Sequence, residues 1–201
     1  MNHPSLYLAS QSPRRLQLLG QLGVSPQLLL PDESEDAEAL EASLPGERPQ
    51  DYVIRVTQLK WMAASARRQR RGWVEAPILC SDTTVALRRI IMGKPGSEAE
   101  AIQMLMSLSG QTHEVLTAVA VGRLRRPTVM LSRSKVTFRK LSRAEVVRYV
   151  DSGEPMGKAG AYAIQGAAQR WITEIKGSYS GIMGLPLFET DQLLRRFRVI
   201  A

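Results

Sequence analysis

The stretch that decides the fold runs from Leu6 to Gly23 and reads LYLASQSPRRLQLLGQLG. Its first four residues form a continuous apolar run, which is typical of a strand buried on both faces. Ser12 and Pro13 then favour the start of a helix, with serine as the N-cap and proline at the first helical position. Leucines at helical spacing follow, and Gly23 can end the helix. The stretch therefore predicts a strand, a tight turn and a helix, as in an α/β fold.

Two arginines, Arg14 and Arg15, lie in the first turn of this predicted helix. Cations at this end oppose the helix dipole, at a cost of about 0.3–1 kcal/mol each when they are exposed. A bound anion would reverse the sign of this effect, because free backbone N–H groups and both guanidinium groups would converge on it. The residues alone leave two interpretations open: solvated arginines on a surface helix, or an anion-binding site.

The composition favours one domain over residues 1–201. Hydrophobic residues make up 44% of the chain, which is ample for a packed core. No apolar run approaches the length of a membrane span, and the N-terminal residues do not resemble a signal peptide, so we expect a cytoplasmic protein without a membrane partner. Cys80 is the only cysteine, which excludes a disulfide within the chain; it lies in an apolar run and is expected to be a core residue.

The formal net charge of +8 indicates an anionic substrate or partner. The densest basic cluster, Arg67 to Arg71, ends a helix that we predict over Pro49 to Arg71. Cations complement the dipole there, so we interpret the cluster as a solvated helix end, with a nucleic-acid contact as the alternative. The acidic run from Asp32 to Asp36 is likewise expected to be mostly solvated. The signatures of common nucleic-acid-binding modules are absent from the sequence, so no specific nucleic-acid partner is expected.

Several charged residues stand where a binding site could form. Asp82 follows the apolar run Ile78 to Ser81, which predicts an aspartate at the carboxyl end of a buried strand, where open α/β sheets bind ligands; a turn residue ending the strand is the alternative. Lys60 lies at the edge of the long helix's apolar stripe, from which it could also extend to solvent. The histidines are His3, in the N-terminal tail, and His113, which we expect in a loop as a turn or packing residue. A serine–histidine triad or a zinc site is therefore hard to build, whereas scattered arginines, lysines and carboxylates suit phosphate chemistry.

The opening stretch resembles the signature of the Maf family of nucleoside triphosphate pyrophosphatases, in which Leu-Ala-Ser-x-Ser-Pro-Arg-Arg precedes Leu-Leu. Further blocks similar to those of the family occur in the family's order and span nearly the whole chain. They are Ser81-Asp82-Thr83, Gly93-Lys94-Pro95, Leu108 to His113, Lys158 to Gly166, Gly177 to Ser180 and Gly184 to Leu187. The resemblance implies a Maf-type (inosine-triphosphatase-like) α/β fold, a twisted mixed sheet flanked by helices, with two lobes around a central cleft.

The family reaction is hydrolysis of a nucleoside triphosphate between its α and β phosphorus atoms, with a divalent cation, Mg²⁺ or Mn²⁺. The resemblance implies that Asp82 is the proton acceptor and Lys94 a second catalytic residue. It implies a metal site formed by Glu33, in the Asp32-Glu33-Ser34 motif, and Asp82. The residues implied to bind the triphosphate are Ser10, Arg14, Arg15 and Lys60. Lys60 belongs to the family's Arg-x-x-x-x-Lys motif, although Leu59 replaces the glutamate that usually precedes this lysine.

Thr83 and Gln165 are similar to the residues of the dTTP/UTP-type members at the same positions of the motifs. The amide of Gln165 offers a donor and an acceptor, which suits the mixed edge of uracil or thymine. The resemblance thus implies a homodimeric pyrophosphatase for dTTP and UTP. The ranking of these substrates and of modified pyrimidine nucleotides stays open. The alternatives are a 7-methyl-GTP pyrophosphatase of the same family, a non-catalytic regulator of septum formation, and a basic nucleic-acid-binding module.

Overall fold

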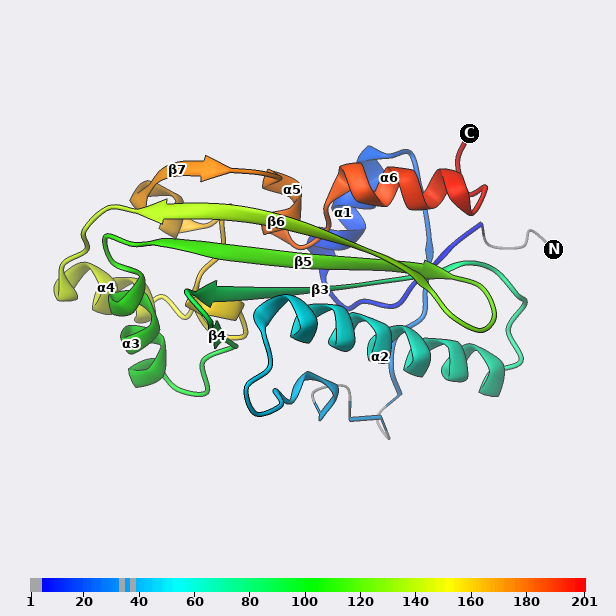
Figure 1. Cartoon of the computed structure of the whole chain (residues 1–201), viewed down its shortest axis with the longest axis horizontal. Coiled ribbons are helices and arrows are strands. Elements are labelled where there is room, and N and C mark those ends of the chain that lie inside the picture. The colour runs from blue at the N-terminus through cyan, green and yellow to red at the C-terminus, as the bar shows by residue number, and fades with distance from the viewer. Residues whose placement is uncertain (1–4, 33–34, 37–38) are drawn as a thin grey trace.

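The computed structural model describes residues 5–32, 35–36 and 39–201. A seven-stranded mixed sheet, in the order β2-β1-β3-β5-β6-β7 with β4 paired to β3 alone, is flanked by helices (Figure 1). The expected α/β class is confirmed. None of the helices in these residues is long and apolar enough to cross a membrane.

The strands, α-helices and 3₁₀ turns have the following bounds. The strands are β1 (Tyr7–Leu8), β2 (Gln27–Leu28), β3 (Ile78–Leu87), β4 (Ile90–Met92), β5 (Thr112–Gly122), β6 (Thr128–Phe138) and β7 (Ile172–Lys176). The α-helices are α1 (Pro13–Gln21), α2 (Pro49–Arg70), α3 (Glu98–Leu108), α4 (Arg143–Val150), α5 (Tyr179–Met183) and α6 (Leu187–Arg196). Short 3₁₀ turns, η1 (Ala39–Glu41), η2 (Ala159–Ala161) and η3 (Ala167–Trp171), complete the set.

The helices cover both faces of the sheet. On β5, Leu116 and Ala118 belong to the cluster that packs against α2, whereas Val119 and Val121 pack with the leucines of α1 and α6. Neighbouring residues of a strand point to opposite faces, so this alternation places α2 on one face and α1 and α6 on the other, as Figure 1 shows. A further apolar cluster, with Phe138 and Trp171, lies at the end of the sheet near α3 and α4.

The predicted strand, turn and helix at the start of the chain are confirmed. β1 is fully buried, Ser12 is the N-cap of α1 and Pro13 is its first residue. The helix ends before Gly23, which has φ of +70°, a conformation that glycine adopts without steric cost. The two-residue length of β1 matters for the site, because the chain leaves the sheet almost at once to enter α1.

Strand β3 differs from the prediction. The expected strand stops at Ser81, but β3 continues through Asp82 to Leu87, because β5 pairs with it from Ile78 to Ala86. On its other edge, β1 pairs with Ile78 and Leu79, and β4 pairs with residues 85–87. Within the described part of the chain, residues 80–84 therefore have no strand partner on that edge. Asp82 stands at the middle of this open edge rather than at a strand end.

The basic cluster that ends α2 is a solvated helix end only in part. Arg67 and Arg68 are buried, and Glu35 accepts hydrogen bonds from Arg67 Nη2 at 2.7 Å and from Arg70 Nη2 at 2.8 Å. Arg71 pairs with Asp32. The expectation of solvated side chains is therefore wrong for Arg67, Arg68 and Glu35, because the chain after β2 brings Glu35 to the end of α2. It is confirmed for Arg70, Asp32 and Asp36, which are exposed.

His113 lies in β5 and not in a loop, because its predicted turn is part of the long β5–β6 ladder. Its ring is buried, contacts Phe138 and Tyr162 edge-on, and places Nε2 2.8 Å from the Tyr162 hydroxyl. Burial lowers the pKa of His113 to about 4, so the ring is neutral at physiological pH. The expected packing role is confirmed.

Glu35→Ala should lower the free energy of unfolding by about 3 kcal/mol at neutral pH, because the nearly buried guanidinium of Arg67 loses its carboxylate. The hydrogen bonds from Arg67 lower the pKa of Glu35 from 4.5 to about 2. A lowered carboxyl pKa stabilises the fold above the unfolded value, and this stabilisation disappears as the pH falls toward the folded value. Urea unfolding should therefore show a smaller difference between wild type and variant at about pH 3 than at about pH 7.

The matched control is Glu174→Ala, which removes an exposed pair with Lys176 and should change stability by less than about 1 kcal/mol. A Glu35→Ala effect as small as the control's would contradict the structural role of Glu35.

Candidate active site

The open edge of β3 forms the floor of a cleft of about 660 Å³. Its walls are the N-terminal turn of α1, one side of α2, the chain after β4, residues 157–165 and the end of α5. The cleft thus collects residues from both ends and the middle of the chain. It lies where the short β1 stops pairing and before β4 begins to pair.

Every predicted site residue that the structure describes lines this cleft. Those brought together are Ser10, Arg14, Arg15, Lys60, Asp82, Thr83, Lys94 and Gln165. Glu33 lies outside the described residues, so its predicted place in the metal site stays a prediction.

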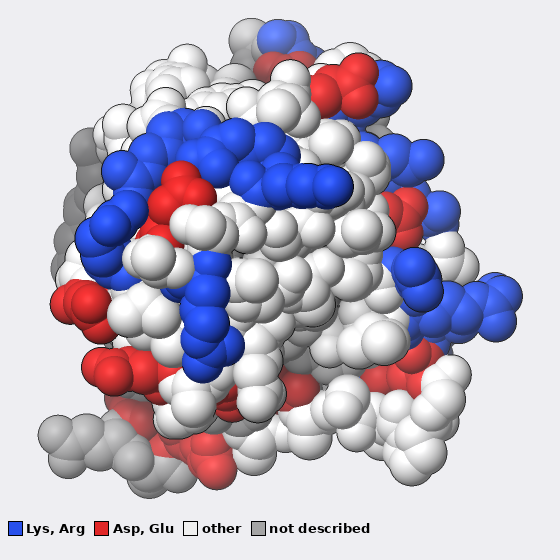
Figure 2. Space-filling view, turned by 90° about the vertical axis from the view of Figure 1, so that its left-hand side faces the viewer, with Lys and Arg blue, Asp and Glu red and all other residues white. Residues whose placement is uncertain are grey.

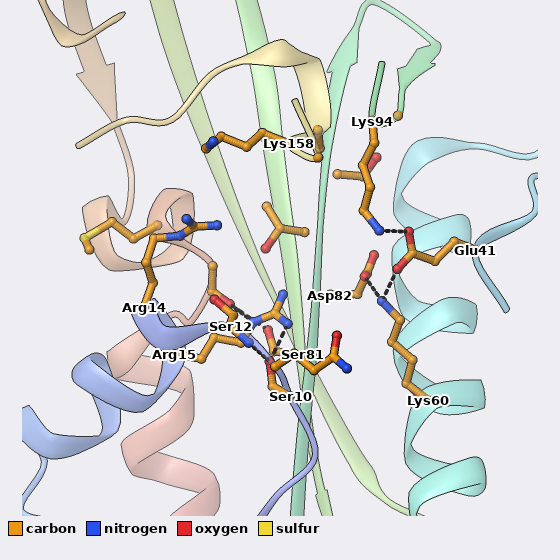
Figure 3. Close-up of a pocket in the computed structure, with 18 of the residues that line it drawn as sticks. Ser10, Ser12, Arg14, Arg15, Glu41, Lys60, Ser81, Asp82, Lys94 and Lys158 are labelled. Atoms are coloured by element: carbon orange, nitrogen blue, oxygen red, sulfur yellow. Dashed lines mark hydrogen bonds and ion pairs between the residues drawn. The ribbon is translucent and has the colours of Figure 1, made fainter. Parts of the chain in front are cut away.

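A chain of ion pairs crosses one wall of the cleft, as the dashed lines of Figure 3 show. Lys60 Nζ, reaching in from α2, lies 2.5 Å from Asp82 Oδ1 and 2.7 Å from Glu41 Oε1. Lys94 Nζ lies 2.8 Å from Glu41 Oε2. Lys60 therefore points into the cleft and holds Asp82, and two lysines from distant segments are joined through one carboxylate.

Glu41 is a site residue that the sequence did not indicate. Burial acts to raise its pKa, but the charges and hydrogen bonds of Lys60 and Lys94 outweigh burial, and the pKa is lowered. Glu41 therefore stays ionised beside Asp82. Glu41 and Lys60 are 19 positions apart, with Glu41 on the short turn η1, and no sequence pattern indicated their contact.

The opposite wall is built on the first turn of α1. Arg15 donates from Nε to the carbonyl oxygen of Gly184 at 2.8 Å and from Nη1 to Ser10 Oγ at 3.1 Å. Ser81 Oγ lies 3.0 Å from the same carbonyl. Burial lowers the pKa of Arg15, and the charge of Asp82 opposes this effect. Arg15 thus ties α1 to the end of α5 while it keeps its charge close to Asp82.

Arg14 differs from its neighbour. It makes no ion pair or hydrogen bond among the described residues, and its guanidinium group extends into the cleft in Figure 3. Of the two interpretations of the first-turn arginines, the solvated surface helix is wrong, because both side chains line the cleft and are only partly exposed.

The two residues expected to read the base have different hydrogen-bonding capacity. Thr83 Oγ1 lies 2.9 Å from Thr117 Oγ1, and Thr117 donates its hydrogen to the carbonyl oxygen of Gly181 at 2.7 Å. Thr83 must therefore donate to Thr117, which leaves its oxygen only as an acceptor toward the cleft. The side-chain amide of Gln165, in contrast, has no hydrogen bond among the described residues and can both donate and accept.

Cys80 lies beneath the floor of the cleft. Burial raises the pKa of its thiol to about 12, so no thiolate nucleophile is available at neutral pH. The expected role as a core residue is confirmed.

The positive charge of the chain is not confined to the cleft. Figure 2 shows lysines and arginines in a band across the upper part of one end of the molecule, with acidic side chains among them and along the lower part. The cleft therefore accounts for only part of the +8 net charge.

A sequence model described as Maf-like protein matches residues 5–197. The chain belongs to the Maf family. Among curated Maf relatives, it is 61% identical to a dTTP/UTP pyrophosphatase of Albidiferax ferrireducens, over 96% of each chain. It is 61% identical to the protein of that name from Cupriavidus pinatubonensis, over 98% of each chain, and 63% identical to that of a Polaromonas species, over 94% of each chain. The expected Maf-type fold and family are thereby confirmed.

Proposed function

We propose that this chain hydrolyses dTTP and UTP to the nucleoside monophosphate and pyrophosphate. The observation that carries the proposal is the carboxylate of Asp82, held by Lys60 on the open edge of β3 and facing the arginines of α1 across the cleft. The shared name of relatives at this identity and coverage supports the same activity and substrate class. The homodimeric state stays a prediction from the resemblance, and the cytoplasmic location stays a prediction from the composition of the sequence.

Asp82 is suited to accept a proton from the attacking water. Lys60 occupies one carboxylate oxygen, Oδ1, at 2.5 Å, and Oδ2 has no hydrogen bond among the described residues. The carboxylate is therefore fixed in direction with one oxygen left for a water proton, which is the geometry that general-base catalysis requires. Lys60 and Lys94 add positive charge where the phosphate becomes more negative in the transition state.

The residues beside Asp82 fit a divalent cation. Asp82 and Glu41 both contact the ammonium group of Lys60. Two carboxylates, whose oxygen atoms are the ligands that divalent cations prefer, therefore lie beside each other in the cleft. The described residues contain no group of three or more His, Cys, Asp or Glu side chains that could hold a metal ion. A Mg²⁺ or Mn²⁺ ion would need only one or two carboxylates, because phosphate oxygens and water can complete its coordination. When bound, such an ion neutralises phosphate charge and orients the substrate. Asp82 and Glu41 would hold it here in exchange for their contacts with Lys60, and the predicted ligand Glu33 lies outside the described residues.

A panel of nucleoside triphosphates tests the proposed function. The purified protein with Mg²⁺ should release pyrophosphate from dTTP and UTP faster than from GTP, ATP and 7-methyl-GTP. A preference for 7-methyl-GTP would overturn the substrate assignment, and the absence of pyrophosphate release from every triphosphate would overturn the activity.

Asp82→Asn should lower kcat by about 10²–10⁴-fold, because an amide cannot accept the water proton. Binding of UTP should stay within a few-fold of wild type, because the amide oxygen can still accept from Lys60. Stopped assays of pyrophosphate release and calorimetric titration measure the two quantities. Glu47→Gln is the control, since it makes the same change in an ion pair with Arg55 outside the cleft. Wild-type kcat in Asp82→Asn would exclude Asp82 as the base.

Gln165→Ala should lower kcat/KM for dTTP and UTP by about 10- to 100-fold, because the base's polar edge would lose its partners at about 1–3 kcal/mol. The same change should lower the ratio of kcat/KM for dTTP or UTP to kcat/KM for GTP. Gln169→Ala, which alters an exposed glutamine outside the cleft in the same segment, serves as the control. Equal losses on all triphosphates would show instead that Gln165 contacts the phosphates or the metal.

A further inference from the structure

The cations around the cleft form two groups with different partners. Lys60 and Lys94 are neutralised by Asp82 and Glu41. On the other side of the cleft, Arg14 and Lys158 line the same space. Among the described residues neither of them has a carboxylate within ion-pair distance. Arg15, near Asp82, also has no carboxylate in ion-pair distance among these residues, but its guanidinium group is held by the Gly184 carbonyl and Ser10. Arg14 and Lys158 are therefore the cations on the side away from Asp82 that are left for a ligand.

Lys158 directs its ammonium group toward Arg14. In Figure 3 the side chain extends from its loop across the cleft, and both cationic groups lie apart from Asp82 and Lys94. Lys158 Nζ contacts the main-chain carbonyl of Glu154. The Glu154 carboxylate is used elsewhere, by the Tyr149 hydroxyl at 2.9 Å and the backbone N–H of Ala167 at 3.1 Å. Burial, and then the charge of Arg14, lower the pKa of Lys158, as expected for two cations placed close together.

The loop that carries Lys158 is fixed over β3. Gly160 has φ of +67°, its N–H donates to the carbonyl oxygen of Gly93 at 3.0 Å, and a Cβ at this position would lie 2.8 Å from the side chain of Val85. The backbone therefore approaches β3 as only glycine allows. This contact fixes the backbone of Lys158, two residues earlier, at the cleft, where the lysine is only partly exposed.

We propose that Lys158 and Arg14 together bind the β- and γ-phosphates of the substrate, the part that leaves as pyrophosphate. This assignment rests on the proposed function. An anion between two unpaired cations removes their mutual repulsion and gains charge-assisted hydrogen bonds. Since Asp82 and Lys60 stand on the other wall, the α-phosphorus lies between the two groups. When the bond between the α-phosphorus and the bridging oxygen breaks, its electron pair stays on pyrophosphate, where Lys158 and Arg14 stabilise the added charge.

Ligand binding separates this role from a general effect of charge. Dissociation constants for pyrophosphate, UMP and the non-hydrolysable α,β-imido analogue of UTP would be measured by titration calorimetry with Mg²⁺. In Lys158→Met, pyrophosphate and the analogue should bind about 10- to 100-fold more weakly, because a charge-assisted hydrogen bond is lost. UMP should bind within about twofold of wild type, and Lys158→Arg should restore most of the affinity for pyrophosphate.

The matched control is Lys176→Met, which removes an exposed lysine on β7 and should leave all three constants unchanged. Thermal unfolding checks that each variant is folded. Pyrophosphate that binds wild type no more tightly than Lys158→Met overturns the inference, and so does an equal loss for UMP. If wild type releases no pyrophosphate from nucleoside triphosphates, the proposed function itself fails; if it does so and Lys158→Met binds pyrophosphate normally, only the assignment of Lys158 fails.

Discussion

One edge of β3 is interrupted, and the rest of the site depends on that interruption. β5 pairs with β3 along almost its whole length, which holds the strand straight and buried. On the other edge β1 pairs only at Ile78 and Leu79, and β4 pairs only from Val85. A strand can thus carry Asp82 in its middle and still present it to a cleft, because no strand of the described residues pairs with β3 at that point.

The interruption follows from local sequence at its two ends. β1 stops after two residues because Ser12 and Pro13 start a helix, and proline has no N–H to continue a strand ladder. The same turn directs the N-terminus of α1, with its two arginines, toward the gap. At the other end, the chain reverses at Arg88, which has φ of +59°, so β4 can pair only with the last residues of β3. The turn at Ser12 and Pro13 therefore both ends β1 and places the two arginines of α1 at the gap.

The sequence was sufficient where the determinants are local. Ser12, Pro13 and Gly23 predict the boundaries of α1. The segments that resemble the Maf family contain most of the predicted residues that line the cleft. It was insufficient where the determinants are distant in the chain. Asp82 looks like the end of a strand until Ala118 of β5 is known to pair with it. Glu41 reaches Lys60 across 19 residues of sequence with no periodic pattern to reveal the contact.

The prediction of solvated charges failed at Arg67, Arg68 and Glu35 for the same reason. The basic and acidic runs each look solvated when considered separately, yet Arg67 and Glu35, 32 residues apart, form one buried ion pair. Paired charges therefore support the fold at the end of α2, whereas Arg14 and Lys158, which have no carboxylate partner in the described part of the chain, remain for a ligand. This division between structural and ligand-binding charges could not be read from charge density along the chain.

The central claim is that Asp82 directs water to the α-phosphorus while the pyrophosphate end of the substrate lies by the cations of the opposite wall. Hydrolysis of UTP in water labelled with heavy oxygen tests this directly, because the label marks the phosphorus atom that was attacked. Mass spectrometry of the products should find the label in the phosphate of UMP and none in pyrophosphate. Label in pyrophosphate would mean that water attacks the β-phosphorus, and would contradict the arrangement of the substrate described above.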